Sequence, residues 1–276
     1  MEAKQKAMRV FIHVILIIMS FVMLVPFLWM VLTAFKSITE STQVNPFVIF
    51  PSEWRLDGFI SALQKLDFLV LYKNTILLIV IRVVCACLTA TMAGDALGRL
   101  NFRGRGFVFG LVMLQMMVPS QIFTTPQYLM MSKAGLLNTM FALVFPGLVT
   151  AFGTFLLRQA YMGLPRDLEE AARLDGCNIP KTFLYVMMPL TRSSMVSLGI
   201  FTALFAFKEL MWPMIVCTSN DMLVLSTALN KLQGQYAKNY PELMAASIYA
   251  CLPMIVIYLI FQKQFVEGIA TSGGKL

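Results

Sequence analysis

Six long apolar runs constrain the fold of this chain more than any other feature. A helix needs roughly 20 consecutive, predominantly apolar residues to cross the hydrocarbon core of a bilayer. Six stretches meet that length, and they cover residues 10–35, 73–97, 106–131, 140–161, 195–216 and 243–261. Only 13% of the 276 residues are charged, whereas a soluble domain carries about 25%. We therefore expect an all-α fold, a polytopic membrane bundle of six transmembrane helices that forms one domain over residues 1–276.

The distribution of lysine and arginine predicts the orientation in the membrane. Six spans place both termini on one side of it. The loops and tails of that side hold thirteen of the 22 basic residues, the other side holds seven, and Arg82 and Lys208 lie within spans. Because cytoplasmic loops are enriched in lysine and arginine, we expect both termini in the cytoplasm and the loops 36–71 and 217–242 outside.

Composition also argues against several functions. The net charge of +8 does not indicate a nucleic-acid partner, because the basic residues lie in short loops between apolar runs. The five cysteines and the single histidine, His13, lack the spacing of metal ligands. No phosphate-binding G-x-x-x-x-G-K-S/T loop is present either. We therefore expect no metal, no cofactor and no enzymatic activity in this chain, and an intramembrane enzyme is disfavoured.

Two prolines, Pro119 and Pro126, fall within the third apolar run. Each removes a helix hydrogen bond, so we expect the helix to kink or break at both positions. Unwound backbone inside a bilayer is tolerated where it is buried or lines a cavity. The prolines are therefore compatible with a transport pathway and equally with a simple packing kink.

The segment 162–192, between the fourth and fifth spans, is polar and helix-prone, which an ordinary membrane loop does not require. Pro165 predicts a helix start. Three acidic side chains follow where they complement the helix dipole: Asp167, Glu169 and Glu170. Gly176 permits a sharply turned backbone, and a second helical stretch, 179–187, leads to Pro189. The pattern predicts a cytoplasmic docking element for another protein; the alternative is an amphipathic loop on the lipid surface.

The same segment resembles a known family. Glu170-Ala171-Ala172, Asp175-Gly176 and Met188-Pro189 resemble the EAA loop of ABC-importer permease subunits. Four further segments resemble the carbohydrate-uptake branch of that family, in particular its shorter, maltose-type permease partner: 101–104 (NFRG), 115–119 (QMMVP) with 135–139 (GLLNT), 207–213 (FKELMWP) and 262–268 (QKQFVEG).

The resemblance implies a division of labour. The chain would form half of a pathway for a sugar or oligosaccharide, as a heterodimer with a second permease subunit in a bacterial plasma membrane. A cytoplasmic ATPase dimer would use ATP and Mg, and an extracytoplasmic solute-binding protein would deliver the substrate. Coupling to the ATPase would fall to the EAA loop, here about 166–175 with the residues after it. Its implied coupling residues are Glu169, Glu170, Ala171, Ala172, Leu174, Asp175, Gly176, Phe183 and Pro189.

The chain departs from the family pattern at Asp95, where tyrosine is usual, and at Lys208, where asparagine is usual. Depth argues against pairing these two, because Asp95 lies near the cytoplasmic end of its span. Arg82 and Glu209 instead lie at similar depths from the outer side. Ionisable groups inside a span usually face the bundle or a wet cavity. We therefore hypothesise that Arg82, Lys208 and Glu209, with Gln115 as a weaker candidate, line or brace the outer half of the pathway; the alternative is a purely structural ion pair.

Two other transport classes remain open. A permease for a polyamine or an osmolyte also carries an EAA loop, but the 115–119 and carboxy-terminal motifs disfavour it. A self-sufficient secondary transporter would often show inverted repeats, which this sequence lacks, and would not need the segment 162–192.

Overall fold

The computed structural model describes residues 2–44, 46–233 and 239–273. All regular structure within these ranges is helical, which confirms the predicted all-α class. Lys238 and Lys275, which enter the orientation count, lie outside the described residues. The chain divides into two compact units, Met1–Phe68 with Ala228–Met254, and Leu69–Thr227 with Ile255–Leu276. Each unit is described separately below.

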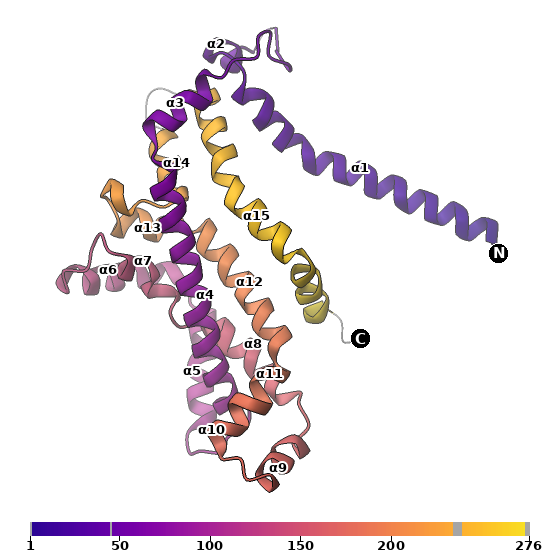
Figure 1. The fold of residues 1–276 in the computed structure, drawn as a ribbon, viewed down its shortest axis with the longest axis vertical. Coiled ribbons are helices and arrows are strands. Elements are labelled where there is room, and N and C mark those ends of the chain that lie inside the picture. The colour runs from indigo at the N-terminus through magenta and orange to yellow at the C-terminus, as the bar shows by residue number, and fades with distance from the viewer. Residues whose placement is uncertain (1, 45, 234–238, 274–276) are drawn as a thin grey trace. The chain divides into compact units, whose positions relative to one another are not determined.

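The first unit contains α1 (Glu2–Ala34), α2 (Ile38–Thr42), α3 (Asp57–Lys65) and the amino-terminal half of α15 (Tyr240–Gly273). Helix α1 runs without a break (Figure 1). Its apolar part, Met8–Ala34, has none of its most hydrophobic window buried. A helix that is apolar on all sides is typical of a membrane span. The α1 surface is therefore suited to lipid rather than to water.

Packing between α3 and α15 holds the first unit together. Gly58 lies so close to the backbone that an added Cβ would meet the carbonyl oxygen of Pro241 at 2.8 Å. The Lys65 ammonium pairs with the Glu242 carboxylate at 2.8 Å, and the Glu242 side chain is 2% exposed. An approach as close as that at Gly58 excludes any larger side chain there.

The start of α2 is fixed by a capping box. Ser37 and Glu40 exchange hydrogen bonds between side chain and backbone at the helix start. The backbone N–H of Ser52 also donates to Glu40. Hydrogen bonds from Ser52 and then from Ser37 lower the pKa of the Glu40 carboxyl to about 2. Glu40 therefore ties two parts of the 36–71 loop together as an ionised group.

The second unit carries most of the helices. Its members are α4 (Phe68–Gly98, which begins at the unit boundary), α5 (Arg105–Met117), a 3₁₀ turn (Ser120–Phe123), α6 (Thr124–Lys133), α7 (Met140–Val144), a 3₁₀ turn (Phe145–Gly147), α8 (Ala151–Met162), α9 (Asp167–Leu174), α10 (Ile179–Thr182), a π-helical turn (Phe183–Met187), α11 (Met188–Leu190), α12 (Arg192–Lys208), α13 (Met211–Val216), a 3₁₀ turn (Asn220–Met222) and α14 (Leu225–Gln233, which crosses into the first unit).

The count of six spans holds if bent helices are included. Three described helices are long and apolar enough to span alone, within α1, α4 and α15. Three further candidates are helix pairs with a bend: α5 with the 3₁₀ turn and α6 (99°), α7 with α8 (46°), and Ile179–Leu190 with α12 (73°). The apolar runs therefore predict the number of spans but not their breaks.

The break in the third span lies at Pro119 alone. Pro119 has no N–H for the carbonyl oxygen of Gln115, which instead accepts a bond from the N–H of Val118 at 3.3 Å. The expected break at Pro126 is wrong. Pro126 lies in the first turn of α6 (Thr124–Lys133), where a backbone N–H has no intrahelical partner to lose.

The expectation of a continuous fifth span over 195–216 is also wrong. The helix ends at Lys208, Glu209 takes an extended conformation, and α13 begins at Met211. Pro213 cannot donate to the carbonyl oxygen of Glu209, and the hydroxyl of Ser226 donates to that oxygen instead, at 2.7 Å. Hydropathy does not report this break because both sides of it are apolar.

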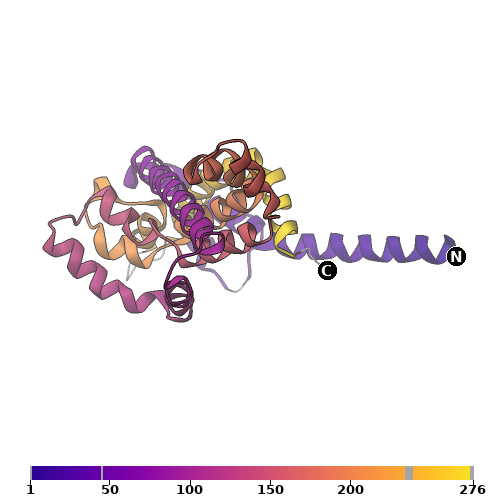
Figure 2. The ribbon, with the colours of Figure 1, turned by 90° about the horizontal axis from the view of Figure 1, so that it is seen from below.

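Close helix packing supports the end of the second unit that carries α9. An added Cβ at Gly94 of α4 would meet the backbone nitrogen of Arg158 in α8 at 2.8 Å. The Arg158 guanidinium in turn lies over the ring of Phe109 in α5, at 3.9 Å. Figure 2 is a view from the end of the second unit that carries α9. Helix α8 thus packs closely against both α4 and α5, and the polar loop follows directly after this packed helix.

Candidate functional site

The polar loop forms the helix, turn and second helix that the sequence predicts. Helix α9 (Asp167–Leu174) follows Pro165 and carries its acidic residues in the first turn and Arg173 in the last, both favourable for the helix dipole. Gly176 then adopts a left-handed backbone with φ +83°. Its N–H donates to the carbonyl of Arg173 at 3.0 Å, and the N–H of Cys177 donates to that of Ala172 at 2.9 Å. This is a Schellman termination, which sets the direction of the chain after α9.

The second helical stretch is not uniform. Asn178 caps α10 (Ile179–Thr182) by accepting a hydrogen bond from the N–H of Lys181 at 3.0 Å. A π-helical turn (Phe183–Met187) follows, and then α11 (Met188–Leu190), which contains Pro189. The predicted helix over 179–187 is therefore confirmed, with one wide turn that periodicity alone does not reveal.

The residues of the EAA motif divide between two faces of α9. Glu170, Ala171, Leu174 and Asp175 are exposed, and Leu174 is 89% exposed. Ala172 is buried, and Glu169 is half-buried. The motif therefore presents one face to the outside and one to the bundle, and the single exposed leucine is by itself ordinary for a protein surface.

Of the later motif residues, Phe183 packs on the core cluster formed by residues of α4, α8 and α12 and by Met187, whereas Pro189 is exposed. The inward side of the loop is therefore attached to the bundle. Its outward side, including Gly176, is free of contacts that would hide it within the described chain.

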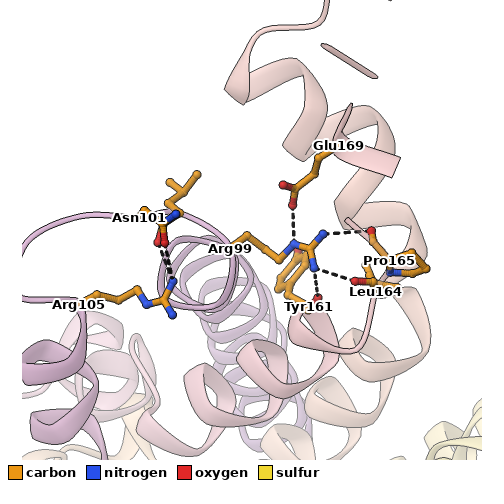
Figure 3. A network of polar contacts seen from close by, with 8 residues as sticks. Arg99, Asn101, Arg105, Tyr161, Leu164, Pro165 and Glu169 are labelled. Atoms are coloured by element: carbon orange, nitrogen blue, oxygen red, sulfur yellow. Dashed lines mark hydrogen bonds and ion pairs between the residues drawn. The ribbon is translucent and has the colours of Figure 1, made fainter. Parts of the chain in front are cut away.

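Arg99, just beyond the end of α4, anchors the root of this loop (Figure 3). Its Nε donates to the Glu169 carboxylate at 2.5 Å. Its other two nitrogens donate to three carbonyl oxygens in the last turn of α8 and just beyond it, those of Tyr161 (3.3 Å), Leu164 (2.7 Å) and Pro165 (3.1 Å). The Arg99 side chain is only 6% exposed. Charge-assisted bonds of this kind, made from a planar guanidinium, fix geometry as well as contributing energy.

Arg99 is a functional candidate that the sequence analysis missed. There it counts only as one of the basic residues of the cytoplasmic side. The available signal is its place directly after the last residues of the second span, but its partners lie 62 to 70 positions away in the chain. No local sequence pattern predicts these hydrogen-bond partners of Arg99.

A pocket of about 380 Å³ opens behind α9. Asp95 and Arg99 of the α4 end line one part of it, and Glu169, Arg173 and Asn178 line another. Asp95 is 9% exposed and has no hydrogen bond from its side chain within the described part of the chain. The pocket therefore contains a buried carboxylate close to an ion pair.

The proposed pathway residues separate into a pair and two isolated side chains. Arg82 and Glu209 form the ion pair expected from their depths, with Nη1 and Oε2 2.5 Å apart and side chains 6% and 28% exposed. Arg82 also donates to the carbonyl oxygen of Leu143. Lys208 and Gln115 are exposed, and neither has a side-chain hydrogen bond or ion pair among the described residues. The geometry of Arg82 is that of a buried brace between α4, α7 and the α12–α13 break.

Comparison with known proteins agrees with this arrangement. Residues 83–270 match the family model described as "Binding-protein-dependent transport system inner membrane component". A similar protein is the arabinooligosaccharides transport system permease protein AraQ of Halalkalibacterium halodurans, 33% identical over 93% of this chain and 92% of its own. The lactose transport system permease protein LacG of Rhizobium radiobacter is 28% identical over 94% of this chain and 93% of its own.

A solved structure shares the fold. One chain in the crystal structure of a bacterial ABC transporter involved in the import of the acidic polysaccharide alginate matches with a TM-score of 0.79. The match covers 94% of this chain and 96% of that one, at 22% identity. Together with the family match and the apolar helices, these likenesses show that the chain belongs to the family of inner-membrane components of binding-protein-dependent transport systems, the permeases of ABC importers.

Proposed function

We propose that this chain is one permease subunit of an ATP-driven importer for a sugar or oligosaccharide. A second permease subunit completes the pathway, an extracytoplasmic binding protein delivers the substrate, and a cytoplasmic ATPase dimer binds α9. Both termini lie in the cytoplasm, as the basic residues predict. The observation that carries the proposal is an exposed helix, α9, rigidly attached at its root to the end of a spanning helix.

The sugar is proposed from the relatives. Those with printed functions include permeases for arabinooligosaccharides, lactose and diacetylchitobiose. Three different sugars in similar permeases support the substrate class, and they do not favour one member of it. A polyamine or osmolyte permease is the alternative within the same family.

The geometry is suited to passing a movement of α9 on to the spanning helices. Leu174 and the exposed face of α9 would fill a groove of the ATPase, with Glu170 at its edge. Closure of the ATPase on ATP and Mg would displace α9. The displacement would pass to α4 through Arg99 and to α12 through the stretch 179–190. Alternation between inward-facing and outward-facing states is a rigid-element transition of a familiar kind.

The test is purification of the tagged chain from its native cells in mild detergent, with mass spectrometry of the co-purified proteins. We expect a second permease subunit and an ATPase. Glu170→Lys, on the exposed face of α9, should reduce ATPase recovery. Glu53→Lys is the matched control, because it makes the same charge change at an exposed site in the loop predicted to face outside.

Recovery of the chain alone, with solute uptake intact, would refute the proposal that this chain is an ABC-importer subunit and would favour a secondary transporter. If the partners are recovered, a co-purified binding protein identifies the solute. A binding protein that holds a polyamine or an osmolyte, and no sugar, would refute the substrate assignment alone.

A further inference from the structure

A carboxylate at the root of α9, that of Asp95, makes no ion pair with the described residues, and the coupling function does not explain its presence. Arg99 has one carboxylate partner, Glu169, on α9. A second carboxylate, Asp95, lines the same pocket four residues before Arg99 in the chain. Two carboxylates and two guanidinium groups, those of Arg99 and Arg173, therefore line the pocket, and Glu169 with Arg99 is the ion pair that the described residues form there.

Asp95 is placed as an alternative acceptor for Arg99. Residues four apart lie on the same face of a helix, and an acid that precedes a base by four is the favourable order. The N–H of Arg99 still bonds to the carbonyl oxygen of Asp95 at 2.7 Å, so the helical spacing continues to this pair. Asp95 is nine-tenths buried, and its side chain makes no hydrogen bond to the residues that the structure describes.

The carboxylate partner of Arg99 belongs to the side that would move. Glu169 is on α9, whereas the three carbonyl oxygens lie in the last turn of α8 (Tyr161) and in the connection to α9 (Leu164 and Pro165). If α9 moves away from α4, Arg99 loses its carboxylate while it remains largely buried. A buried charge without a partner is costly, and so is a buried carboxylate beside a second negative charge.

We propose that Arg99 has two carboxylate partners, Glu169 while α9 lies against α4 and Asp95 when α9 moves away. The exchange gives each position of the loop a paired arginine, which makes the root of α9 a two-state element. Arg99, Asp95 and Glu169 are positioning residues that bias the equilibrium between the two positions. The inference rests on the proposed function, because ATP binding by the partner ATPase is what would move α9.

The exchange predicts opposite effects for the two carboxylates. Asp95→Asn removes the second partner, so it should hold the loop in the position seen here and reduce ATP hydrolysis, both basal and stimulated by loaded binding protein. Glu169→Gln removes the first partner, so it should release the loop and raise basal hydrolysis. A shift of about five-fold in each direction matches the low end of typical coupling between sites. The double variant should return basal hydrolysis close to that of wild type.

The experiment measures ATP hydrolysis by the complete reconstituted complex, with and without loaded binding protein. Asp95→Glu keeps the carboxylate and should behave like wild type. Asp221→Asn is the matched control, an exposed aspartate remote in the chain from α9. Asp95→Tyr, which carries the residue usual in the family, is a second neutral variant if Asp95→Asn fails to insert.

Three results would overturn the exchange while leaving the transport function intact. The first is wild-type hydrolysis in the neutral variants of Asp95. The second is a loss in both single variants with a larger loss in the double, as a purely structural cluster would produce. The third is failure of Asp95→Glu together with Asp95→Asn, which would assign the effect to shape. A wild-type complex with no stimulated hydrolysis would instead overturn the proposed function and the exchange with it.

Discussion

Glu209→Gln tests the buried ion pair of the second unit most directly. The substitution keeps the shape of the side chain and removes the charge that neutralises Arg82. Removal of one partner from a buried pair costs about 3–5 kcal/mol, because the other charge is left buried. Glu209 is 28% exposed, so water can reach the site and we expect the low end of this range, about 3 kcal/mol. For a chain of this length that corresponds to a fall in Tm of about 6–12 °C.

Arg82→Met should be less damaging than Glu209→Gln. It removes the buried charge itself, and the carboxylate that remains is the more exposed of the two partners. The carbonyl of Leu143 loses its bond, at a cost of about 1–3 kcal/mol. Arg82→Met combined with Glu209→Gln should therefore be more stable than Glu209→Gln alone.

The assay is thermal denaturation of the purified protein in detergent, followed by the loss of the folded peak in size-exclusion chromatography. Solute uptake, divided by the amount of inserted protein, is measured in parallel. If the double variant is as unstable as the sum of the two single losses, the reasoning about an unpaired buried charge is refuted. If uptake per inserted molecule is unchanged in both single variants, the pair is structural only and has no role in the pathway.

Three further predictions follow from the same structure. Gly176→Pro cannot adopt the φ of +83°, so the protein should insert normally but hydrolyse ATP without transport; normal uptake in a reconstituted complex would contradict this. Gly94→Val overpacks the α4–α8 contact, where a Cβ would lie 2.8 Å from backbone, and should cost about 1–3 kcal/mol in thermal denaturation, whereas Gly110→Ala, in open space, should not destabilise. Hydrogen bonds, first those from Ser52, lower the pKa of Glu40 to about 2. The stability that ionised Glu40 gives to the 36–71 loop is therefore complete above the unfolded pKa of about 4.3 and is lost as the pH falls through about 2. Hydrogen exchange of this loop should distinguish wild type from Glu40→Gln near pH 6 but not near pH 2.

Local physical rules account for the features that the sequence predicts correctly. The number of spans follows from hydropathy, and the start of α9 and the turn at Gly176 follow from residue preferences at helix ends. The Arg82–Glu209 pair can be predicted from the sequence because two opposite charges at similar depth in the membrane have few other partners. Each of these inferences needs only neighbouring residues or a position along the membrane normal.

The features that the sequence does not predict depend on tertiary contacts. The end of α12 at Lys208 arises from Pro213, but its stability requires the hydroxyl of Ser226, which comes from a different segment. The role of Arg99 requires knowledge that the α8–α9 connection lies beside the end of α4. Neither the periodicity nor the composition of the sequence predicts such tertiary contacts.

The π-helical turn between Phe183 and Met187 has a consequence for the kind of motion that the loop can transmit. A π turn holds one residue more than an α turn. If the wide turn passes along the helix, the residues that it passes rotate by about 100° relative to the rest of the helix, one residue's share of an α-helical turn. A shift of the wide turn can therefore rotate side chains of the stretch 179–190 about the helix axis, and deletion of a single residue from this turn should prevent that rotation while leaving the helix continuous.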